Sequence, residues 1–172
     1  MPRAPRTAVI VAMPAAEPLV GGWRLLHTGD APLGVPAHVT LLVPWVPPSE
    51  LTPEVEDRLA RLVAEEPAFD VVFPRAARWP EILYVEPEPS EPFVRLTHAL
   101  AAEWPEHPPY EGQHETVVPH LTVAKSGDAG LLDRIAAELE PALPVRQRVS
   151  EAQLYEEDEG GRWRERRRFR LG

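Results

Sequence analysis

One short pattern occurs twice in the chain and constrains its fold more than any other feature. The pattern reads histidine, apolar residue, threonine, apolar residue, once in each half of the sequence. Both copies lie in aliphatic and β-branched runs, which favour β-strands. Because strand side chains alternate between faces, His38 and Thr40 share one face of their strand, and His120 and Thr122 share one face of theirs. Each strand therefore presents an imidazole and a hydroxyl on one side and aliphatic side chains for a core on the other.

Prolines and capping residues indicate where the other elements begin and end. The chain has 22 prolines, well above the usual share of about 5%. Thr52, followed by a proline, predicts a helix start, and Ser90 and residues 126–128 predict two more. The alternation of apolar residues predicts strands over 7–13, 38–43, 69–73, 82–86, 116–124, 145–155 and 162–171. Residues 14–36 are rich in proline and glycine and predict turns with one short element around 23–26.

The order of these elements contains a weak internal repeat. A strand carrying the histidine motif, a helix and a further strand occur at 38–73 and again at 120–155. Such a repeat predicts a single domain, residues 1–172, made of two related lobes at about 7–86 and 87–171. We therefore expect an α+β fold. It would be a bilobal sandwich with pseudo-two-fold symmetry, in which two antiparallel sheets line a central groove and the helices lie outside.

The charge of the chain limits the kind of partner it can bind. The net charge is −9, which argues against duplex nucleic acid, because phosphate contacts require a basic surface. Residues 162–170 carry six arginines and one glutamate, or +5, so the rest of the chain carries −14. Strand alternation would place five of these side chains on one face: Arg162, Arg164, Arg166, Arg168 and Arg170. That face is either simply solvated or a wall that faces phosphate.

Other features of the composition concern the compartment. The chain has no cysteine, which is compatible with a reducing cytoplasm. The apolar run at 7–13 is short and is followed closely by Pro14 and Glu17, so it predicts a first strand rather than a signal peptide. No run approaches the length needed to span a membrane. We expect a soluble cytoplasmic monomer that binds no membrane.

Two imidazoles on opposite walls of a groove suit displacement at phosphorus. Attacking and leaving oxygens lie roughly in line, so one group must take a proton from the nucleophile and another must give one to the leaving oxygen. Histidine can do either near neutral pH, and neighbouring hydroxyls can donate hydrogen bonds to the non-bridging oxygens. The sequence shows no H-x-H or H-E-x-x-H pattern for a metal. From the pattern alone, catalysis and ordinary strand positions for these residues both remain open.

The segments GVPAHVTLLVP at 34–44 and PHLTVA at 119–124 resemble the two-histidine phosphoesterase superfamily, which includes the 2′-5′ RNA ligases and cyclic phosphodiesterases. The order of elements is similar over about residues 7–171. The resemblance implies a bilobal fold and metal-independent attack, without a cofactor, on a 2′,3′-cyclic phosphate at a nucleotide or RNA end. It also implies that His38 is the proton donor and His120 the proton acceptor.

The sequence leaves several alternatives open. Water as nucleophile gives hydrolysis, whereas a 5′-hydroxyl gives 2′-5′ RNA ligase activity, as in RNA processing. A module that binds phosphorylated RNA ends without turnover is one alternative, and a phosphodiesterase for a non-RNA metabolite such as an ADP-ribose cyclic phosphate is another. Tyr110, Trp45 and Trp79 could stack on a base or serve as packing. His114 could reach the groove, although an ordinary loop position is the simpler interpretation.

Overall fold

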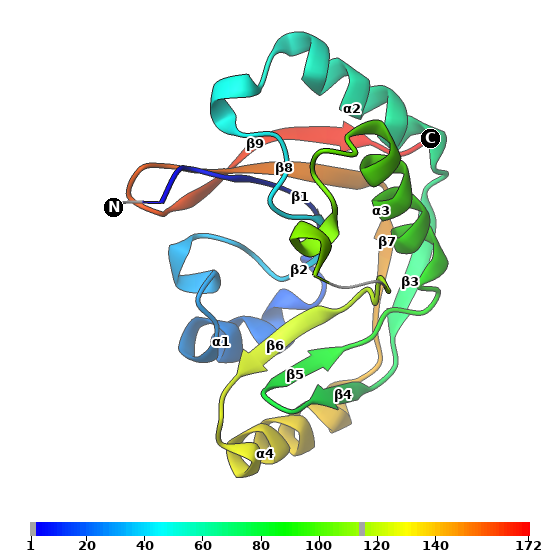
Figure 1. The fold of residues 1–172 in the computed structure, drawn as a ribbon. Helices are drawn as coiled ribbons and strands as arrows, with labels where there is room; N and C mark the ends of the chain where they lie inside the picture. The colour runs from blue at the N-terminus through cyan, green and yellow to red at the C-terminus, as the bar shows by residue number, and fades with distance from the viewer. Residues whose placement is uncertain (1–2, 114–115) are drawn as a thin grey trace.

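The structure, a computed structural model, describes residues 3–113 and 116–172. Its strands are β1 (Thr7–Ala12), β2 (His38–Leu42), β3 (Phe69–Phe73), β4 (Ala76–Trp79), β5 (Ile82–Val85), β6 (Leu121–Lys125), β7 (Val145–Val149), β8 (Glu151–Glu157) and β9 (Trp163–Arg170). Its α-helices are α1 (Glu17–His27), α2 (Pro53–Glu65), α3 (Glu91–Glu103) and α4 (Ala129–Leu139) (Figure 1). Within these residues, no helix has the length and apolar character that crossing a bilayer requires.

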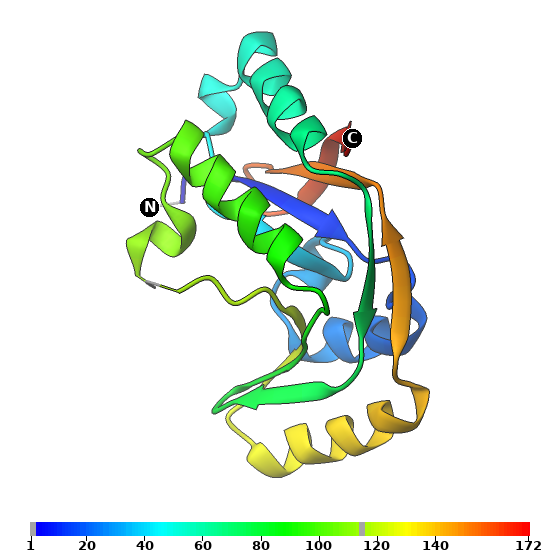
Figure 2. The same ribbon diagram turned by 90° about the vertical axis from the view of Figure 1, so that its right-hand side faces the viewer.

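All strand pairs are antiparallel, and the strands form three sheets. The largest has the order β2-β1-β8-β9, a second has the order β4-β5-β6, and β3 pairs with β7 in a two-stranded ribbon that runs beside both (Figures 1 and 2). The α+β fold with antiparallel sheets is therefore confirmed, with the ribbon as an addition to the two expected sheets. Each sheet combines strands from both sides of residue 86. The division into lobes at that residue stays a prediction.

The helices cover the outer faces of the two larger sheets. Helices α2 and α3 pack against the four-stranded sheet at β9 and β2, whereas α1 and α4 pack against the three-stranded sheet at β6 and β5. The apolar residues of both motif strands enter the core between sheet and helices: Val39, Leu41, Leu121 and Val123 are all buried. The alternation expected from the sequence therefore leaves the histidine and threonine faces pointing away from this core.

Local capping explains two of the three helices that the sequence predicts. The Thr52 hydroxyl accepts a hydrogen bond from the Val55 amide at 3.2 Å at the start of α2, and the Asp128 carboxylate accepts one from the Leu131 amide at 3.1 Å at the start of α4. Ser90 occupies the capping position of α3, but its side chain makes no capping hydrogen bond. The expected side-chain cap at Ser90 is therefore wrong, although the helix is present.

Helix α1 replaces the turns predicted for 14–36. It runs through two consecutive glycines, which each cost about 1 kcal/mol in a helix relative to alanine. A tertiary contact explains why the helix forms there. A Cβ on Gly21 would lie 2.6 Å from the Glu17 carboxylate, and that carboxylate accepts a hydrogen bond from the Ala37 amide at 2.8 Å. The missing side chain therefore lets Glu17 connect the helix to the segment before β2.

Two strand predictions also differ from the structure. The single strand expected over 145–155 is divided at Ser150 into β7 and β8, which belong to different sheets. The strand expected over 116–124 begins only at Leu121, so His120 lies immediately before β6. Strand β4 was not predicted, because its sequence, AARW, lacks alternation.

The five-arginine face expected on the last strand is wrong. The pairing of β8 with β9 shifts between Leu154 and Tyr155. Arg166 therefore lies in a β-bulge, opposite neither of these two residues. As a result, Arg166 and Arg167 both form ion pairs with Glu56 of α2. Arg168 pairs instead with Glu151 of β8 and with Glu165 of its own strand. Alternation assumes an unbroken ladder, and the bulge interrupts it.

Candidate active site

A cleft of about 340 Å³ contains all four motif residues. It lies where β2, at the edge of the four-stranded sheet, approaches β6, at the edge of the three-stranded sheet. His38, Thr40, His120 and Thr122 all line it. The structure thus brings together two motifs that lie about 80 residues apart in the chain.

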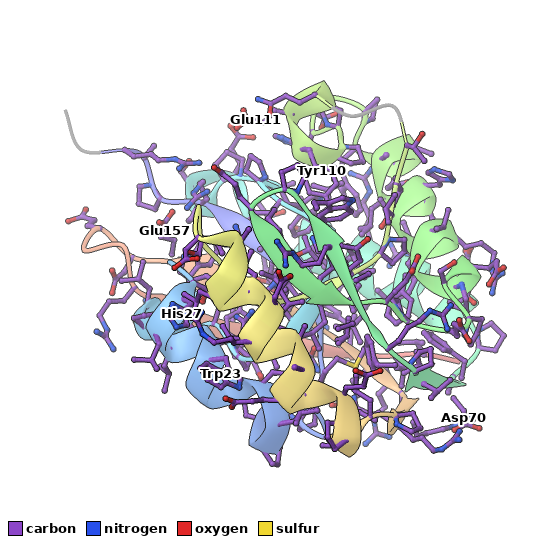
Figure 3. The ribbon with its side chains drawn as sticks, turned by 90° about the horizontal axis from the view of Figure 1, so that it is seen from below. Trp23, His27, Asp70, Tyr110, Glu111 and Glu157 are labelled. Atoms are coloured by element: carbon purple, nitrogen blue, oxygen red, sulfur yellow. The ribbon has the colours of Figure 1, made fainter. Side chains whose placement is uncertain are left out.

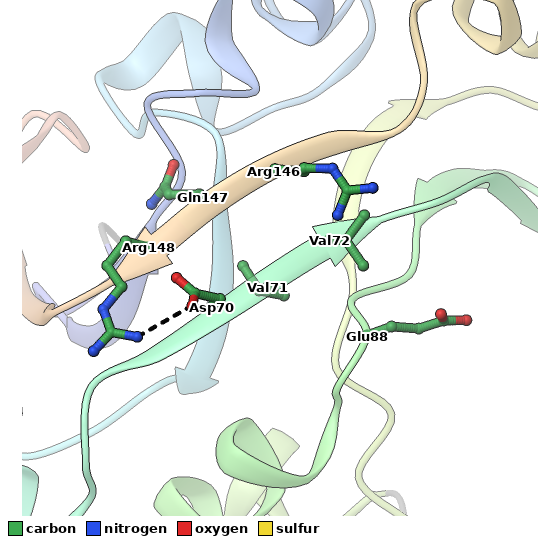
Figure 4. A pocket seen from close by; sticks show the side chains of 7 residues that line it. All are labelled: Asp70, Val71, Val72, Glu88, Arg146, Gln147 and Arg148. Atoms are coloured by element: carbon green, nitrogen blue, oxygen red, sulfur yellow. Dashed lines mark ion pairs between the residues drawn. The ribbon is translucent and has the colours of Figure 1, made fainter.

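A second hollow, of about 430 Å³, lies over the β3–β7 ribbon and offers a weaker constellation (Figure 4). Its charged residues include Asp70 and Arg148, which pair with each other at 3.4 Å. Its described lining contains no histidine, hydroxyl or thiol that could act as a nucleophile or exchange protons near pH 7. The cleft with the two motifs is therefore the candidate active site.

The first motif holds its histidine in one tautomer. His38 Nδ1 lies 2.7 Å from the Pro36 carbonyl oxygen, which can only accept, so Nδ1 carries a proton and donates it there. Nε2 then has a lone pair and lies 3.1 Å from the Thr40 hydroxyl, which donates to it. The pKa of His38 is lowered to about 4, and burial is the largest cause. The nearby Arg24 cation is the second cause of this lowering, whereas Asp30 and the Pro36 hydrogen bond oppose it.

The second motif repeats this arrangement. His120 Nδ1 donates to the Val118 carbonyl at 2.8 Å, again two residues earlier in the chain. Its ring packs nearly perpendicular to Trp79, with 4.8 Å between centroids, and also contacts Tyr84. Burial lowers the pKa of His120, and Lys125 lowers it further, whereas the hydrogen bond to Val118 opposes the shift. Both imidazoles are therefore neutral at pH 7, and each uses Nδ1 for the backbone.

Two charged residues near the first motif were missed in the sequence. Arg24 of α1 is only 1% exposed, and it pairs with Asp30 at 2.9 Å. Burial alone would raise the pKa of Asp30, but the Arg24 charge and hydrogen bond, together with His38, lower it overall. The helix itself carried the signal: Arg24 lies four residues after Val20, on the same buried face. The prolines and glycines of residues 14–36 predict turns instead, and a segment of turns has no buried face on which Arg24 would stand out.

The remaining walls supply cations and aromatic rings. Lys125 and Arg6 line the cleft together with Tyr110, Tyr155 and Trp163. Tyr110 comes from the loop between α3 and β6 (Figure 3), and Trp163 is the first residue of β9. The arginines of 162–170, all of them described, do not line the cleft.

The three aromatic candidates from the sequence have different surroundings. Tyr110 lines the cleft, and Trp79 packs against the His120 ring. Trp45 is buried in the core against Trp104, at 4.9 Å between centroids, so it is a packing residue. His114 lies outside the described residues. Within residues 3–113 and 116–172, no group of three or more histidine or acidic side chains is placed to hold a metal ion.

Comparison with known proteins is consistent with this geometry. The profile of the 2′-5′ RNA ligase superfamily matches residues 12–161. Comparison with curated protein sequences gave no match. Among solved structures, E. coli LigT complexed with 3′-AMP superposes with a TM-score of 0.62 at 19% identity, covering 98% of this chain and 99% of that one. E. coli LigT complexed with NADP+ gives 0.60 at 19% identity, with the same coverage. TT0787 of Thermus thermophilus gives 0.59 at 23% identity over 96% of this chain and 97% of that one. At these identities the structural likeness concerns the fold.

Proposed function

The chain belongs to the 2′-5′ RNA ligase superfamily, and from that premise we propose that it is a metal-independent phosphodiesterase that opens 2′,3′-cyclic phosphates at ribonucleotide or RNA ends. One observation carries the proposal. His38 and His120 line one cleft, and each commits Nδ1 to a backbone carbonyl. Their Nε2 atoms are therefore the ones that can exchange protons with a substrate.

In this scheme water attacks phosphorus opposite the 3′ oxygen. His120 Nε2 takes the proton of the attacking water, the bond from phosphorus to the 3′ oxygen breaks, and His38 Nε2–H protonates that oxygen. The product is a 2′-phosphate with a free 3′-hydroxyl. If the 5′-hydroxyl of a second RNA replaces water, the same steps give a 2′-5′ linkage. Thr40 and Thr122 donate hydrogen bonds to the non-bridging oxygens, where charge accumulates.

The donor role of His38 requires a proton that the free protein does not hold at pH 7. Burial and the Arg24 charge keep the pKa of His38 at about 4. A phosphate diester brings a negative charge close to His38, which favours the protonated imidazole. When the phosphate is bound, the Thr40 hydroxyl can turn from Nε2 to a phosphate oxygen. Substrate binding and proton uptake at His38 are therefore coupled.

The other walls of the cleft favour a nucleotide-sized ligand. Tyr110, Tyr155 and Trp163 offer rings on which a base can stack, and E. coli LigT has been crystallised with 3′-AMP and ATP. Every group in the scheme comes from one chain, so a monomer suffices. A cytoplasmic location, where RNA ends occur, is part of the proposal.

The first test is turnover in the presence of a chelator. With excess EDTA, the protein should open 2′,3′-cyclic mononucleotides or a cyclic-ended RNA, and product analysis should find the 2′-phosphate. Activity that disappears with EDTA and returns with zinc or magnesium would contradict the metal-free scheme. Tight binding of phosphorylated RNA ends without any turnover would favour a binding module. Turnover of cyclic phosphates on non-RNA nucleotides alone would point to a metabolite phosphodiesterase.

Lys125 provides a second test, because it lines the cleft beside His120. Lys125→Gln should raise KM about tenfold, because a charge-assisted contact with phosphate contributes roughly 1.5–3 kcal/mol when desolvated and less at an exposed position. It should also flatten the salt dependence of KM. Lys125→Arg should preserve both. Arg75→Gln is the matched control, since Arg75 lies on the surface and pairs with Glu88. An unchanged KM in Lys125→Gln would remove Lys125 from substrate binding.

A further inference from the structure

Arg24 is a buried cation whose contacts reach both histidine motifs. Its guanidinium donates to the Thr122 carbonyl at 2.8 Å and to the Asp30 carboxylate at 2.9 Å. It also lies 3.4 Å from the Val35 and Pro36 carbonyl oxygens. Burying a charge costs several kcal/mol unless hydrogen bonds compensate for the lost water. The buried charge of Arg24 lies where the two motifs approach each other.

The two motif strands have no backbone ladder between them. β2 and β6 are edge strands of different sheets, so no strand pairing fixes the distance from His38 to His120. The planar guanidinium of Arg24 contacts the backbone of both motif segments. One Nη binds the backbone of Thr122, and the other approaches the Pro36 carbonyl, which accepts the Nδ1 proton of His38. Arg24 is therefore a direct link between the backbone of one motif and the group that orients the histidine of the other.

We propose that Arg24 is a positioning residue that sets the separation of the two motifs and holds the His38 ring, through the Pro36 carbonyl, with its Nε2 lone pair toward the cleft. The expected effect on catalysis rests on the proposed function, whereas the effect on His38 can be measured in the free protein. Only arginine has a fork that can serve several carbonyls and a carboxylate at once. The residue touches neither substrate nor reacting atoms in this scheme.

Two substitutions separate positioning from mere stability. Arg24→Met keeps much of the side-chain length but loses the charge and every donor, and Arg24→Lys keeps the charge but loses the fork. In variants that remain folded, both should lower kcat about 10- to 100-fold with KM changed less than about threefold, since misplacement by an ångström can cost that much. Arg58→Met is the matched control, because Arg58 is half-exposed and pairs with Glu103 on the outer helices.

The titration of His38, followed by NMR, reports on the surroundings of this ring and not on the stability of the fold. In Arg24→Met the pKa of His38 should rise from about 4 toward its ordinary value, because the nearby cation is gone. In Arg24→Lys it should stay low. The groups facing His38 are Arg24 from α1, Asp30 from the following loop, Thr40 on its own strand and His120 across the cleft. Arg58→Met should leave the titration unchanged.

Three outcomes would overturn the proposal. One is normal kcat in folded Arg24→Lys or Arg24→Met. Another is an unchanged His38 titration in folded Arg24→Met. The third concerns the wild type and does not depend on any variant folding: nitrogen shifts that place the His38 proton on Nε2 rather than Nδ1. If the wild type turns over no cyclic phosphate, the proposed function fails, and the titration and tautomer still decide the role of Arg24.

Discussion

Alanine at either His38 or His120 should lower turnover of a cyclic phosphate by roughly 10²–10⁴-fold, because each substitution removes one positioned proton transfer. The double variant should be little slower than the slower single variant, since a donor without an acceptor completes no cycle. Both side chains line the cleft and their motif neighbours Val39 and Leu121 form the core, so the variants should stay folded. Initial rates on a 2′,3′-cyclic nucleotide, with circular dichroism as the fold check, measure this.

A histidine outside the cleft provides the control. His98 is exposed on α3, and His98→Ala should retain the wild-type rate. Near-normal rates in either His38→Ala or His120→Ala would rule out the acid–base scheme. Additive losses in the double variant would mean that the two histidines act in separate steps rather than as a pair.

A substrate with a good leaving group separates the two roles. Such a leaving group needs little protonation, so it should restore much of the rate of His38→Ala and little of the rate of His120→Ala. Restoration of His120→Ala instead would reverse the assignment. The pKa values give a reason to test the assignment of donor and acceptor directly. Both imidazoles are neutral in the free protein, and the proposed donor, His38, has its pKa lowered to about 4.

The local parts of the site could be predicted from the sequence. Strand alternation predicts that His38 lies beside Thr40 on one face, and the distance from His38 Nε2 to Thr40 Oγ1 is 3.1 Å. The proline and threonine signals also predicted α2, because a cap depends on residues within one turn. These features are decided by neighbours in the sequence, and the structure preserves them.

The predictions that were wrong concern features that depend on contacts between residues distant in the sequence. Helix α1 forms despite its glycines because Glu17 binds the backbone at Ala37, and no helix propensity includes that contact. Arg24 was missed along with that helix. The bulge at Arg166 arises from pairing between β8 and β9, and Arg166 and Arg167 form ion pairs with Glu56 of α2 instead of lining the cleft. Local periodicity carries no information about either contact.

Acid should begin to destabilise the folded protein near pH 6.5, above the ordinary pKa values of carboxylates. The pKa of His38 is about 4 in the folded protein and about 6.5 when unfolded. Between these values the unfolded chain binds a proton that the folded protein does not, so the free energy of unfolding falls as the pH falls from about 6.5 to 4. At 1.36 kcal/mol per pKa unit, His38 alone contributes a loss of at most about 3 kcal/mol, and less where water reaches the ring. His120, whose pKa is also lowered, acts in the same direction.

Urea denaturation from pH 7.5 to 4.5 measures this loss, and His38→Gln isolates its source. Glutamine does not titrate, so the variant should lose clearly less stability than the wild type across this window. The lowered pKa of Asp30 affects stability only below its ordinary value of 3.8, outside the window. His98→Gln, at the exposed position on α3, should follow the wild-type curve. If His38→Gln loses stability as steeply as the wild type, His38 is not the group that takes up the proton. The interpretation that His38 is neutral in the free protein would then be wrong, and so would the coupling of substrate binding to proton uptake.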